Sequence, residues 1–283
     1  MKLFATGLLF MAILTGCAPN YTSDIDSLTP FGICYTKLQP AQVEPYKLVV
    51  IEPDFYSRQE ILELKKTGTK IIAYATLGEV DPNRWYFGAM EEYGFRGKND
   101  VWNSFFIDVE NPEVRNMILN QVLPEIMAKG VDGLFLDTID AVSPETERGD
   151  MKDAMGELIQ SIGAKFPNKI IIQNAGLFLL NETADHVDAF LTESLASNFD
   201  FENQEYLIRS DSAYTARLGF LNEYVEQSRV PFMVLDYADS QAHLRQIRSR
   251  LDTLGRPYFI SNIALNRLPE NADSVANKFP AGD

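Results

Sequence analysis

A short apolar segment that ends in a carboxylate recurs along this chain and constrains its fold more than any other feature. Residues 133–136 read GLFL and are followed at once by Asp137. A continuous apolar run of this length is typical of a strand that is buried on both faces of a parallel sheet. The same layout returns at residues 188–193, which end in Glu193, and at residues 230–236, which end in Asp236. Because ligands bind at the carboxyl ends of parallel strands, these acids predict a pocket lined by carboxylates.

Eight such apolar runs predict eight strands, and helical segments lie between most of them. The predicted strands span residues 31–35, 48–52, 70–75, 133–137, 169–174, 189–193, 231–236 and 257–262. The predicted helices span residues 57–66, 111–130, 151–166, 203–227 and 240–254. Strands that alternate with helices at this spacing indicate parallel βαβ units. We therefore expect an α/β fold, a (β/α)8 TIM-like barrel, with an open doubly wound sheet as the alternative.

One connection, residues 78–111, is long for a loop in such a fold. It carries eight aromatic residues: Trp85, Tyr86, Phe87, Tyr93, Phe95, Trp102, Phe105 and Phe106. One interpretation is a packed cap over the top of the barrel. The other is an aromatic wall on which the C–H faces of sugar rings stack. A segment of this kind can serve both purposes.

The first residues predict the location of the protein. Residues 1–16 form a short basic and apolar segment that is typical of a signal peptide and too short to span a bilayer. Its end, LTGC at residues 14–17, resembles the lipobox of bacterial lipoproteins, which implies lipidation of Cys17. The alternative is an ordinary secretory signal with a chance cysteine. With Ala18 after the cysteine, we expect a lipid-anchored protein of the bacterial cell envelope, in the outer membrane if the host is Gram-negative.

The remaining boundaries follow from composition. Residues 17–29 are predicted to be a polar tether, residues 30–270 the barrel domain, and residues 271–283 a C-terminal tail. The sequence gives no sign of a second domain or an internal repeat, and we expect a monomer.

Composition excludes several classes of function. The chain has two histidines and two cysteines, with no HExxH motif, zinc spacing, GxSxG motif or dinucleotide fingerprint. We therefore expect no metal and no cofactor. The net charge of −15 argues against binding to nucleic acid and to anionic lipid, so that contact with the membrane would be through the Cys17 lipid alone. The charge favours a cationic partner, although it also suits a soluble acidic surface without one.

Four segments together resemble glycoside hydrolase family 114, the endo-α-1,4-polygalactosaminidases and their relatives. They are LVVIEPD at 48–54, IAYATLGEVDP at 72–82, GLFLDTID at 133–140 and VLDYAD at 234–239. The resemblance implies a (β/α)8 barrel that cleaves an α-1,4-linked, partly deacetylated amino-sugar polysaccharide of the galactosamine type without a cofactor. Glycoside hydrolysis needs two carboxyl groups, one ionised and one protonated.

The resemblance extends to the retaining α-glycosidases of the galactosidase clan, whose two catalytic carboxyl groups lie on the fourth and sixth strands. It implies that Asp137 is the nucleophile and Glu193 the general acid/base. Asp140 takes the active role if Asp137 only caps the turn that follows it. Glu79 is a further alternative, because it is as well placed at a strand end as Glu193. For a retaining enzyme we expect carboxyl groups about 5–5.5 Å apart.

Further polar residues at the predicted strand ends are candidates for substrate binding: Tyr35, Asp54, Tyr74, Glu79, Asn174, Asp236 and Tyr237. Asp236 could hold a cationic amine by a charge-assisted hydrogen bond. Two rival functions remain. The first is a non-catalytic polysaccharide-binding lipoprotein on the same barrel. The second is a carbohydrate deacetylase, which usually needs a metal held by one aspartate and two histidines, a set that the two unclustered histidines of this chain do not supply.

Overall fold

The structure, a computed structural model, describes residues 25–269. The predicted signal peptide, the lipidation site at Cys17, most of the tether, and the C-terminal tail lie outside the described residues. Within residues 25–269, no helix is long and apolar enough to cross a membrane.

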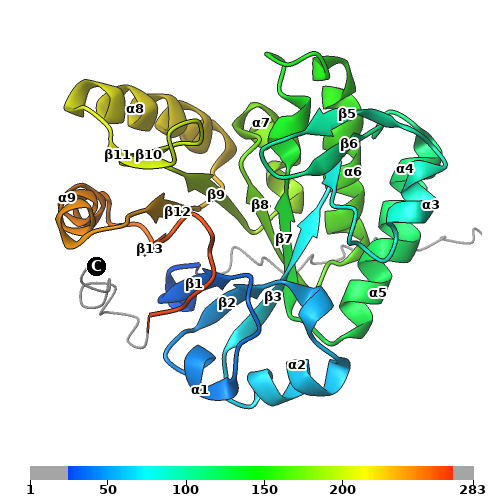
Figure 1. The fold of residues 1–283 in the computed structure, drawn as a ribbon, viewed down its shortest axis with the longest axis horizontal. Coiled ribbons are helices and arrows are strands. Elements are labelled where there is room, and N and C mark those ends of the chain that lie inside the picture. Colours follow the sequence, from blue (N-terminus) through cyan, green and yellow to red (C-terminus); the bar gives the residue numbers. More distant parts are fainter. Residues whose placement is uncertain (1–24, 270–283) are drawn as a thin grey trace, which may run out of the picture.

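Eight parallel strands form the barrel, and helices surround it (Figure 1). Neighbouring strands follow the order β1–β2–β3–β7–β8–β9–β12–β13, with every ladder parallel. Their bounds are β1 (Phe31–Cys34), β2 (Leu48–Ile51), β3 (Lys70–Thr76), β7 (Gly133–Asp137), β8 (Ile170–Asn174), β9 (Ala189–Glu193), β12 (Phe232–Tyr237) and β13 (Tyr258–Ser261). The predicted (β/α)8 barrel is confirmed, and all eight predicted strands form within one residue of the predicted bounds.

The barrel closes at a seam between β1 and β13, which lie side by side. No backbone ladder joins these two strands in the part of the chain that the structure describes. Side chains bridge the seam instead: the ring centroids of Phe31 and Phe259 lie 6.0 Å apart. Just beyond the strands, the backbone N–H of Tyr35 donates to the carbonyl oxygen of Leu265 at 2.7 Å. The open doubly wound alternative is therefore wrong.

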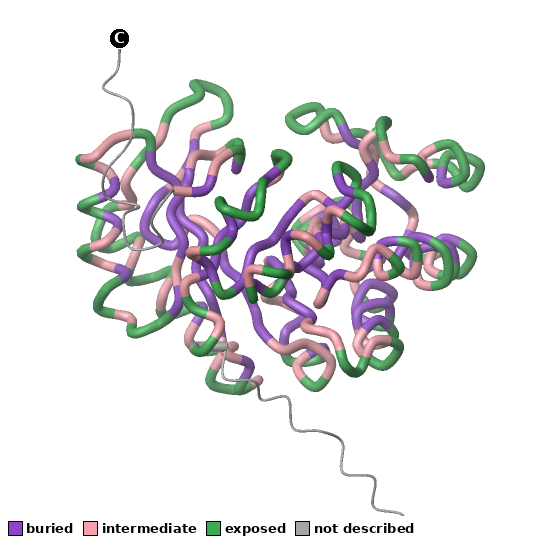
Figure 2. The backbone as a smooth tube through the Cα atoms, turned by 90° about the horizontal axis from the view of Figure 1, so that it is seen from below, coloured by how far each residue is buried: buried purple, intermediate pink, exposed green. Residues whose placement is uncertain are grey.

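The strands are buried on both faces, whereas the exposed residues lie on outer helices and loops (Figure 2). This burial explains why the strands are continuously apolar. The close packing of neighbouring strands explains the glycine at the start of β7. A Cβ on Gly133 would lie 2.0 Å from the carbonyl oxygen of Ile170 on β8, so only glycine permits the two backbones to come this close.

The outer layer consists of α1 (Pro40–Val43), α2 (Arg58–Lys65), α4 (Pro112–Met117), α5 (Leu123–Ala128), α6 (Lys152–Lys165), α7 (Leu180–Thr183), α8 (Asp211–Ser228) and α9 (Gln241–Leu251). A π-helical turn, Ile118–Val122, links α4 to α5. The helix α2 begins as predicted at Ser57, which forms a capping box with Glu60.

Two insertions interrupt the alternation of strands and helices. The first insertion, residues 79–107, holds β4 (Glu79–Val80), α3 (Phe87–Glu91), β5 (Phe95–Asn99) and β6 (Ser104–Ile107), whose strands form an antiparallel sheet. The second insertion, residues 197–208, is the antiparallel hairpin of β10 (Ser197–Asp200) and β11 (Glu205–Ile208). The predicted helix at 203–227 is wrong over its first eight residues. Residues 205–208 alternate between exposed and partly buried positions, which suits a strand once β10 pairs with them.

Candidate active site

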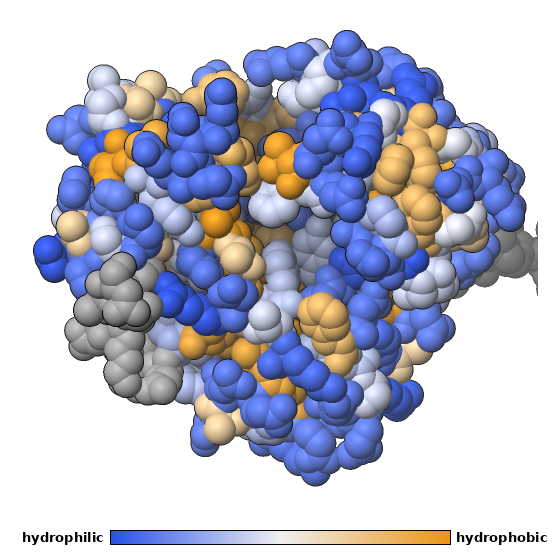
Figure 3. Space-filling view, in the orientation of Figure 1, coloured by the Kyte–Doolittle hydropathy of each residue, from blue (hydrophilic) through white to orange (hydrophobic). Residues whose placement is uncertain are grey.

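A cavity of about 730 Å³ opens at the carboxyl ends of the barrel strands. The molecule is hollowed near the centre of the face drawn in Figure 3. Residues at or near the ends of five strands line the cavity: Tyr35, Tyr74, Asp137, Glu193 and Tyr237. Six carboxylates but only two guanidinium groups contribute to its wall, so the cavity is acidic.

The two predicted catalytic carboxylates lie on either side of a single amide. Asp137, Asn174 and Glu193 are the last residues of the adjacent strands β7, β8 and β9. The Nδ2 of Asn174 donates to Oδ1 of Asp137 and to Oε1 of Glu193, at 2.7 Å in each case. These two oxygens are therefore no farther apart than twice that distance. Asn174 itself is almost fully buried and is not among the residues that line the cavity.

The residue after each of these three side chains has a left-handed backbone. The φ angles are 61° at Thr138, 60° at Ala175 and 53° at Ser194. This conformation costs a residue other than glycine about 1 kcal/mol or more. Three neighbouring strands thus end in the same sharp turn, which points their last side chains toward one another.

Thr138 also ties the end of β7 to the start of the first insertion. Its Oγ1 accepts hydrogen bonds from the backbone N–H groups of Leu77, Gly78 and Glu79 at 2.8–3.2 Å, and lies 2.7 Å from the hydroxyl of Thr76. A Cβ on Gly78 would lie 2.3 Å from the carbonyl oxygen of Thr138, so glycine is required there. This close approach holds the backbone beside Asp137 in place.

The surroundings of Glu193 favour its protonated form. Burial and then the negative charge of Asp137 raise the pKa of this carboxyl, while hydrogen bonds from Tyr237 and Asn174 oppose the rise. The hydroxyl of Tyr237 donates to Oε2 of Glu193 at 2.5 Å. A carboxyl group whose pKa is raised in this way can act as a general acid.

Two further tyrosines complete the wall beside Asp137. The rings of Tyr35 and Tyr74 meet edge to face with centroids 5.0 Å apart, and the hydroxyl of Tyr74 is hydrogen-bonded to Asp137. Burial is the main cause that raises the pKa of both hydroxyls well above the usual value, and the charge of Asp137 is the second cause. Both tyrosines therefore remain hydrogen-bond donors throughout the physiological pH range.

Asp140 and Glu79, the alternatives to Asp137, both line the cavity but have other partners. Asp140 accepts a hydrogen bond from the backbone N–H of Gly176 at 2.8 Å, and desolvation raises the pKa of its carboxyl. Glu79 is buried and accepts hydrogen bonds from Nδ2 of Asn99 at 3.2 Å and from the hydroxyl of Ser104. Both of these donors belong to the first insertion.

Three predicted substrate-binding residues, Asn174, Asp236 and Asp54, are not among the residues that line the cavity. Asp236 is fully buried and accepts hydrogen bonds from the backbone N–H groups of Ala196 and Ser197 at 2.8 Å and from the Ser197 hydroxyl. Side chains alternate along a strand, so that Tyr237 faces the cavity and Asp236 faces away from it. The predicted role of Asp236 as an amine ligand is therefore corrected: this carboxylate anchors the second insertion.

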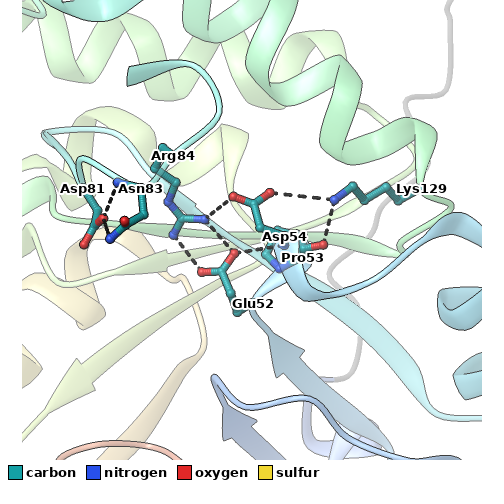
Figure 4. A network of polar contacts seen from close by, with 7 residues as sticks. All are labelled: Glu52, Pro53, Asp54, Asp81, Asn83, Arg84 and Lys129. Carbon is teal, nitrogen blue, oxygen red and sulfur yellow. Dashed lines mark hydrogen bonds and ion pairs between the residues drawn. The ribbon is translucent and has the colours of Figure 1, made fainter. Parts of the chain in front are cut away.

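Asp54 takes part in an ion-pair network at the end of β2 (Figure 4). Arg84, from the first insertion, donates to both carboxylate oxygens of Glu52 at 2.6 and 2.7 Å and to Oδ2 of Asp54 at 2.9 Å. Its guanidinium group also lies over the ring of Tyr74, 5.5 Å from the centroid. Glu52 and Arg84 line the cavity, and the sequence did not identify either as a site residue. The acid at the end of β2 was visible in the sequence, but its partner lies 32 residues away.

The fold agrees with a comparison of sequences. The profile of Glycoside-hydrolase family GH114 matches residues 18–274. The chain belongs to family GH114. It is therefore a glycoside hydrolase, and such chemistry requires two carboxyl groups.

Several known proteins are similar to this GH114 chain in sequence or in fold. An uncharacterized protein of Deinococcus radiodurans is 23% identical over 258 residues, covering 85% of this chain and 80% of that protein. The glycoside hydrolase domain of PelA from Pseudomonas aeruginosa superimposes with a TM-score of 0.75 at 23% identity, covering 85% of this chain and 97% of the other. Ega3 of Aspergillus fumigatus, solved in complex with galactosamine, gives a TM-score of 0.62 at 15% identity over 84% of this chain and 91% of the other.

Proposed function

We propose that this GH114 chain hydrolyses an α-1,4-linked, partly deacetylated galactosamine-type exopolysaccharide with retention of configuration. Asp137 is the nucleophile, and Glu193 is the general acid/base. The observation that carries the proposal is the amide of Asn174, which donates to both carboxylates at 2.7 Å. Oδ1 of Asp137 and Oε1 of Glu193 therefore lie no farther apart than twice this length. Such a distance suits retaining glycosidases, whose carboxyl groups lie about 5–5.5 Å apart, better than inverting ones at about 6.5–9.5 Å.

The proposed reaction has two steps. In the first, Glu193 gives its proton to the glycosidic oxygen while an oxygen of Asp137 attacks the anomeric carbon, which forms a glycosyl-enzyme ester and releases the leaving sugar. In the second, Glu193, now ionised, removes a proton from water, and the water oxygen displaces Asp137 from the anomeric carbon. Tyr237 and Asn174 donate to Glu193 and can stabilise its ionised form between the two steps.

The choice of substrate rests on chemistry and on similarity. The six carboxylates that line the cavity attract an amine-bearing polymer, and Ega3 was solved in complex with galactosamine. The test is incubation of the protein with α-1,4-galactosamine oligomers of graded acetylation, followed by mass spectrometry of the products. NMR of the first-formed anomer then distinguishes retention from inversion. If no oligomer is cleaved at any degree of acetylation, the proposed substrate is wrong.

Cleavage of the amine-bearing polymer is expected to weaken as salt rises. Exposed charges are screened over about 10 Å at 0.1 M salt, so the attraction between the acidic cavity and the cationic chain should fall. We expect KM for deacetylated oligomers to increase severalfold between about 0.02 and 0.5 M sodium chloride, and KM for fully acetylated oligomers to remain nearly constant. The measurement is KM for both oligomers across the salt series. Equal salt dependence for both would show that the charge of the cavity has no role in binding.

We further propose that Cys17 carries lipid and anchors the enzyme to the cell envelope. The proposal rests on the LTGC sequence at residues 14–17 after a short apolar segment. Labelled palmitate should be incorporated into the wild-type protein in a bacterial host and not into the Cys17→Ala variant. Label that persists in Cys17→Ala would rule out lipidation at this residue. Cys34→Ala is the matched control, because Cys34 is buried in β1 and should not affect labelling.

A further inference from the structure

The two insertions meet at the rim of the cavity through exposed aromatic side chains. Trp102 lies in the turn between β5 and β6, and Phe201 lies in the turn between β10 and β11. Their ring centroids are 5.4 Å apart, edge to face, and both residues line the cavity. Even so, Trp102 is 54% and Phe201 40% exposed. Large aromatic surface left open to water beside a cavity is a common mark of a binding site.

The ring of Phe201 is held from behind by buried contacts. Phe201 packs edge to face on the buried Phe199, with centroids 4.9 Å apart, and Phe199 packs in turn on Tyr206 at 4.8 Å. The hydroxyl of Tyr206 accepts a hydrogen bond from the backbone N–H of Ile263 at 3.0 Å, which fastens the second insertion to the segment after β13. Phe201 is therefore exposed on one side but fixed on the other.

The turn that carries Trp102 is fixed by Glu79. Asn99 and Ser104, on either side of this turn, both donate hydrogen bonds to the Glu79 carboxylate. A buried carboxylate that accepts this many hydrogen bonds holds its donors firmly. Glu79 therefore positions the Trp102 turn.

We propose that Trp102 and Phe201 together form a sugar-binding subsite at the rim of the cavity, separate from Asp137 and Glu193. A ring of the polysaccharide stacks its C–H face on these aromatic surfaces while another part of the chain is cleaved. The inference rests on the proposed function and extends it by naming where a non-reacting sugar binds. Binding energy from such a remote ring helps to hold the scissile bond in position.

The two tryptophans of the chain permit a direct test, because they are Trp85 and Trp102. Trp85 is 55% exposed, belongs to the same insertion and meets Tyr86 edge to face at 5.2 Å, but it is not among the residues that line the cavity. In an inactive Asp137→Asn background, Trp85→Phe leaves Trp102 as the only tryptophan, and Trp102→Phe leaves Trp85. Titration with a deacetylated α-1,4-galactosamine oligomer should change the emission of Trp102 in a saturable manner and leave that of Trp85 unchanged.

The outcomes separate this inference from the proposed function. If the wild type cleaves the oligomer but Trp102 emission does not respond, or if Trp85 responds equally, the subsite is wrong and the hydrolase activity stands. If the oligomer is neither bound nor cleaved, both proposals fail.

Kinetics provide a second test that a local folding defect would not imitate. The ratio of kcat/KM for the polymer to kcat/KM for the shortest cleaved oligomer should fall about tenfold in Trp102→Ala and in Phe201→Ala. It should remain at the wild-type value in Trp85→Ala, and Trp102→Tyr should restore most of it. A loss that is equal for long and short substrates would overturn the subsite, because it would indicate a general effect on the catalytic centre.

Discussion

Asp137→Asn is expected to abolish glycosidic cleavage while leaving binding of the polymer nearly intact. The amide is isosteric with the carboxylate but cannot form the glycosyl-enzyme ester, so kcat should fall by a factor of about 10³ or more. Glu193→Gln should cause a comparable loss on the natural polymer, because the leaving oxygen would no longer receive a proton. The measurement is kcat on galactosamine oligomers, together with a binding isotherm for each variant.

The losses of activity in Asp137→Asn and in Glu193→Gln should differ on activated substrates. A glycoside whose leaving group departs without protonation should regain most of its first-step rate with Glu193→Gln but not with Asp137→Asn. The alkaline limb of the wild-type pH profile should report the raised pKa of Glu193 and should be absent from that first step in Glu193→Gln. If Asp137→Asn retains most of its activity, the assignment is wrong and Asp140 becomes the next candidate.

The Tm of Glu193→Gln, measured across a range of pH, provides the control that this variant is folded. The pKa of Glu193 in the folded chain is raised above its ordinary value of 4.5, so folding favours the protonated carboxyl. The stability that this preference contributes is fully present below pH 4.5 and is lost as the pH rises through the folded-state pKa. Glutamine does not ionise. The Tm of Glu193→Gln relative to wild type should therefore increase as the pH is raised from acid to neutral.

The second large effect is expected at Asn174. Asn174→Ala removes the donor shared by Asp137 and Glu193, and loss of one preorganised donor of this kind should lower kcat about 10²-fold. The bond from Asn174 lowers the pKa of Glu193, so its removal should raise that pKa and shift the alkaline limb to higher pH. KM should change little. The measurement is a pH profile of kcat and of kcat/KM for the variant and the wild type.

Two further variants sharpen the test of Asn174. Asn174→Asp keeps the shape but places a third carboxylate between two others, and we expect a larger loss than in Asn174→Ala. Asn262→Ala is the matched control, an asparagine directly after β13 whose amide donates to Asn266 rather than to a catalytic carboxylate. If Asn174→Ala has the kcat and the pH profile of the control, the shared amide does not organise the site.

The prediction for Asp236 fails because of strand geometry. Asp236 ends an apolar run in the sequence, but β12 extends one residue further, and Tyr237 rather than Asp236 faces inward. Since side chains alternate along a strand, a difference of one residue turns a side chain from one face to the other. Asp137 and Glu193 are the last residues of their strands, as the sequence predicts, and their side chains therefore lie at the cavity.

The aromatic segment at residues 78–111 illustrates a different limit. Its two interpretations, a packed cap and an aromatic wall, apply to different residues. Phe87, Phe95 and Phe105 pack on one another with centroids 4.9–5.6 Å apart, as a cap would, whereas Trp102 is exposed at the cavity. The ring composition was visible in the sequence. The division of the rings between the two roles depends on the antiparallel sheet that β4, β5 and β6 form.

The sequence by itself determined the eight strands, the barrel and the presence of acids at one end of it, because these follow from local apolar patterns and their spacing. Only the tertiary structure decided which side chains meet. The amide of Asn174 lies 37 residues from Asp137 and 19 from Glu193, and the exposed rings of Trp102 and Phe201 come from separate insertions. Contacts of this kind arise when barrel closure brings the carboxyl ends of several strands to one mouth, and no local pattern encodes the partner that a side chain will find there.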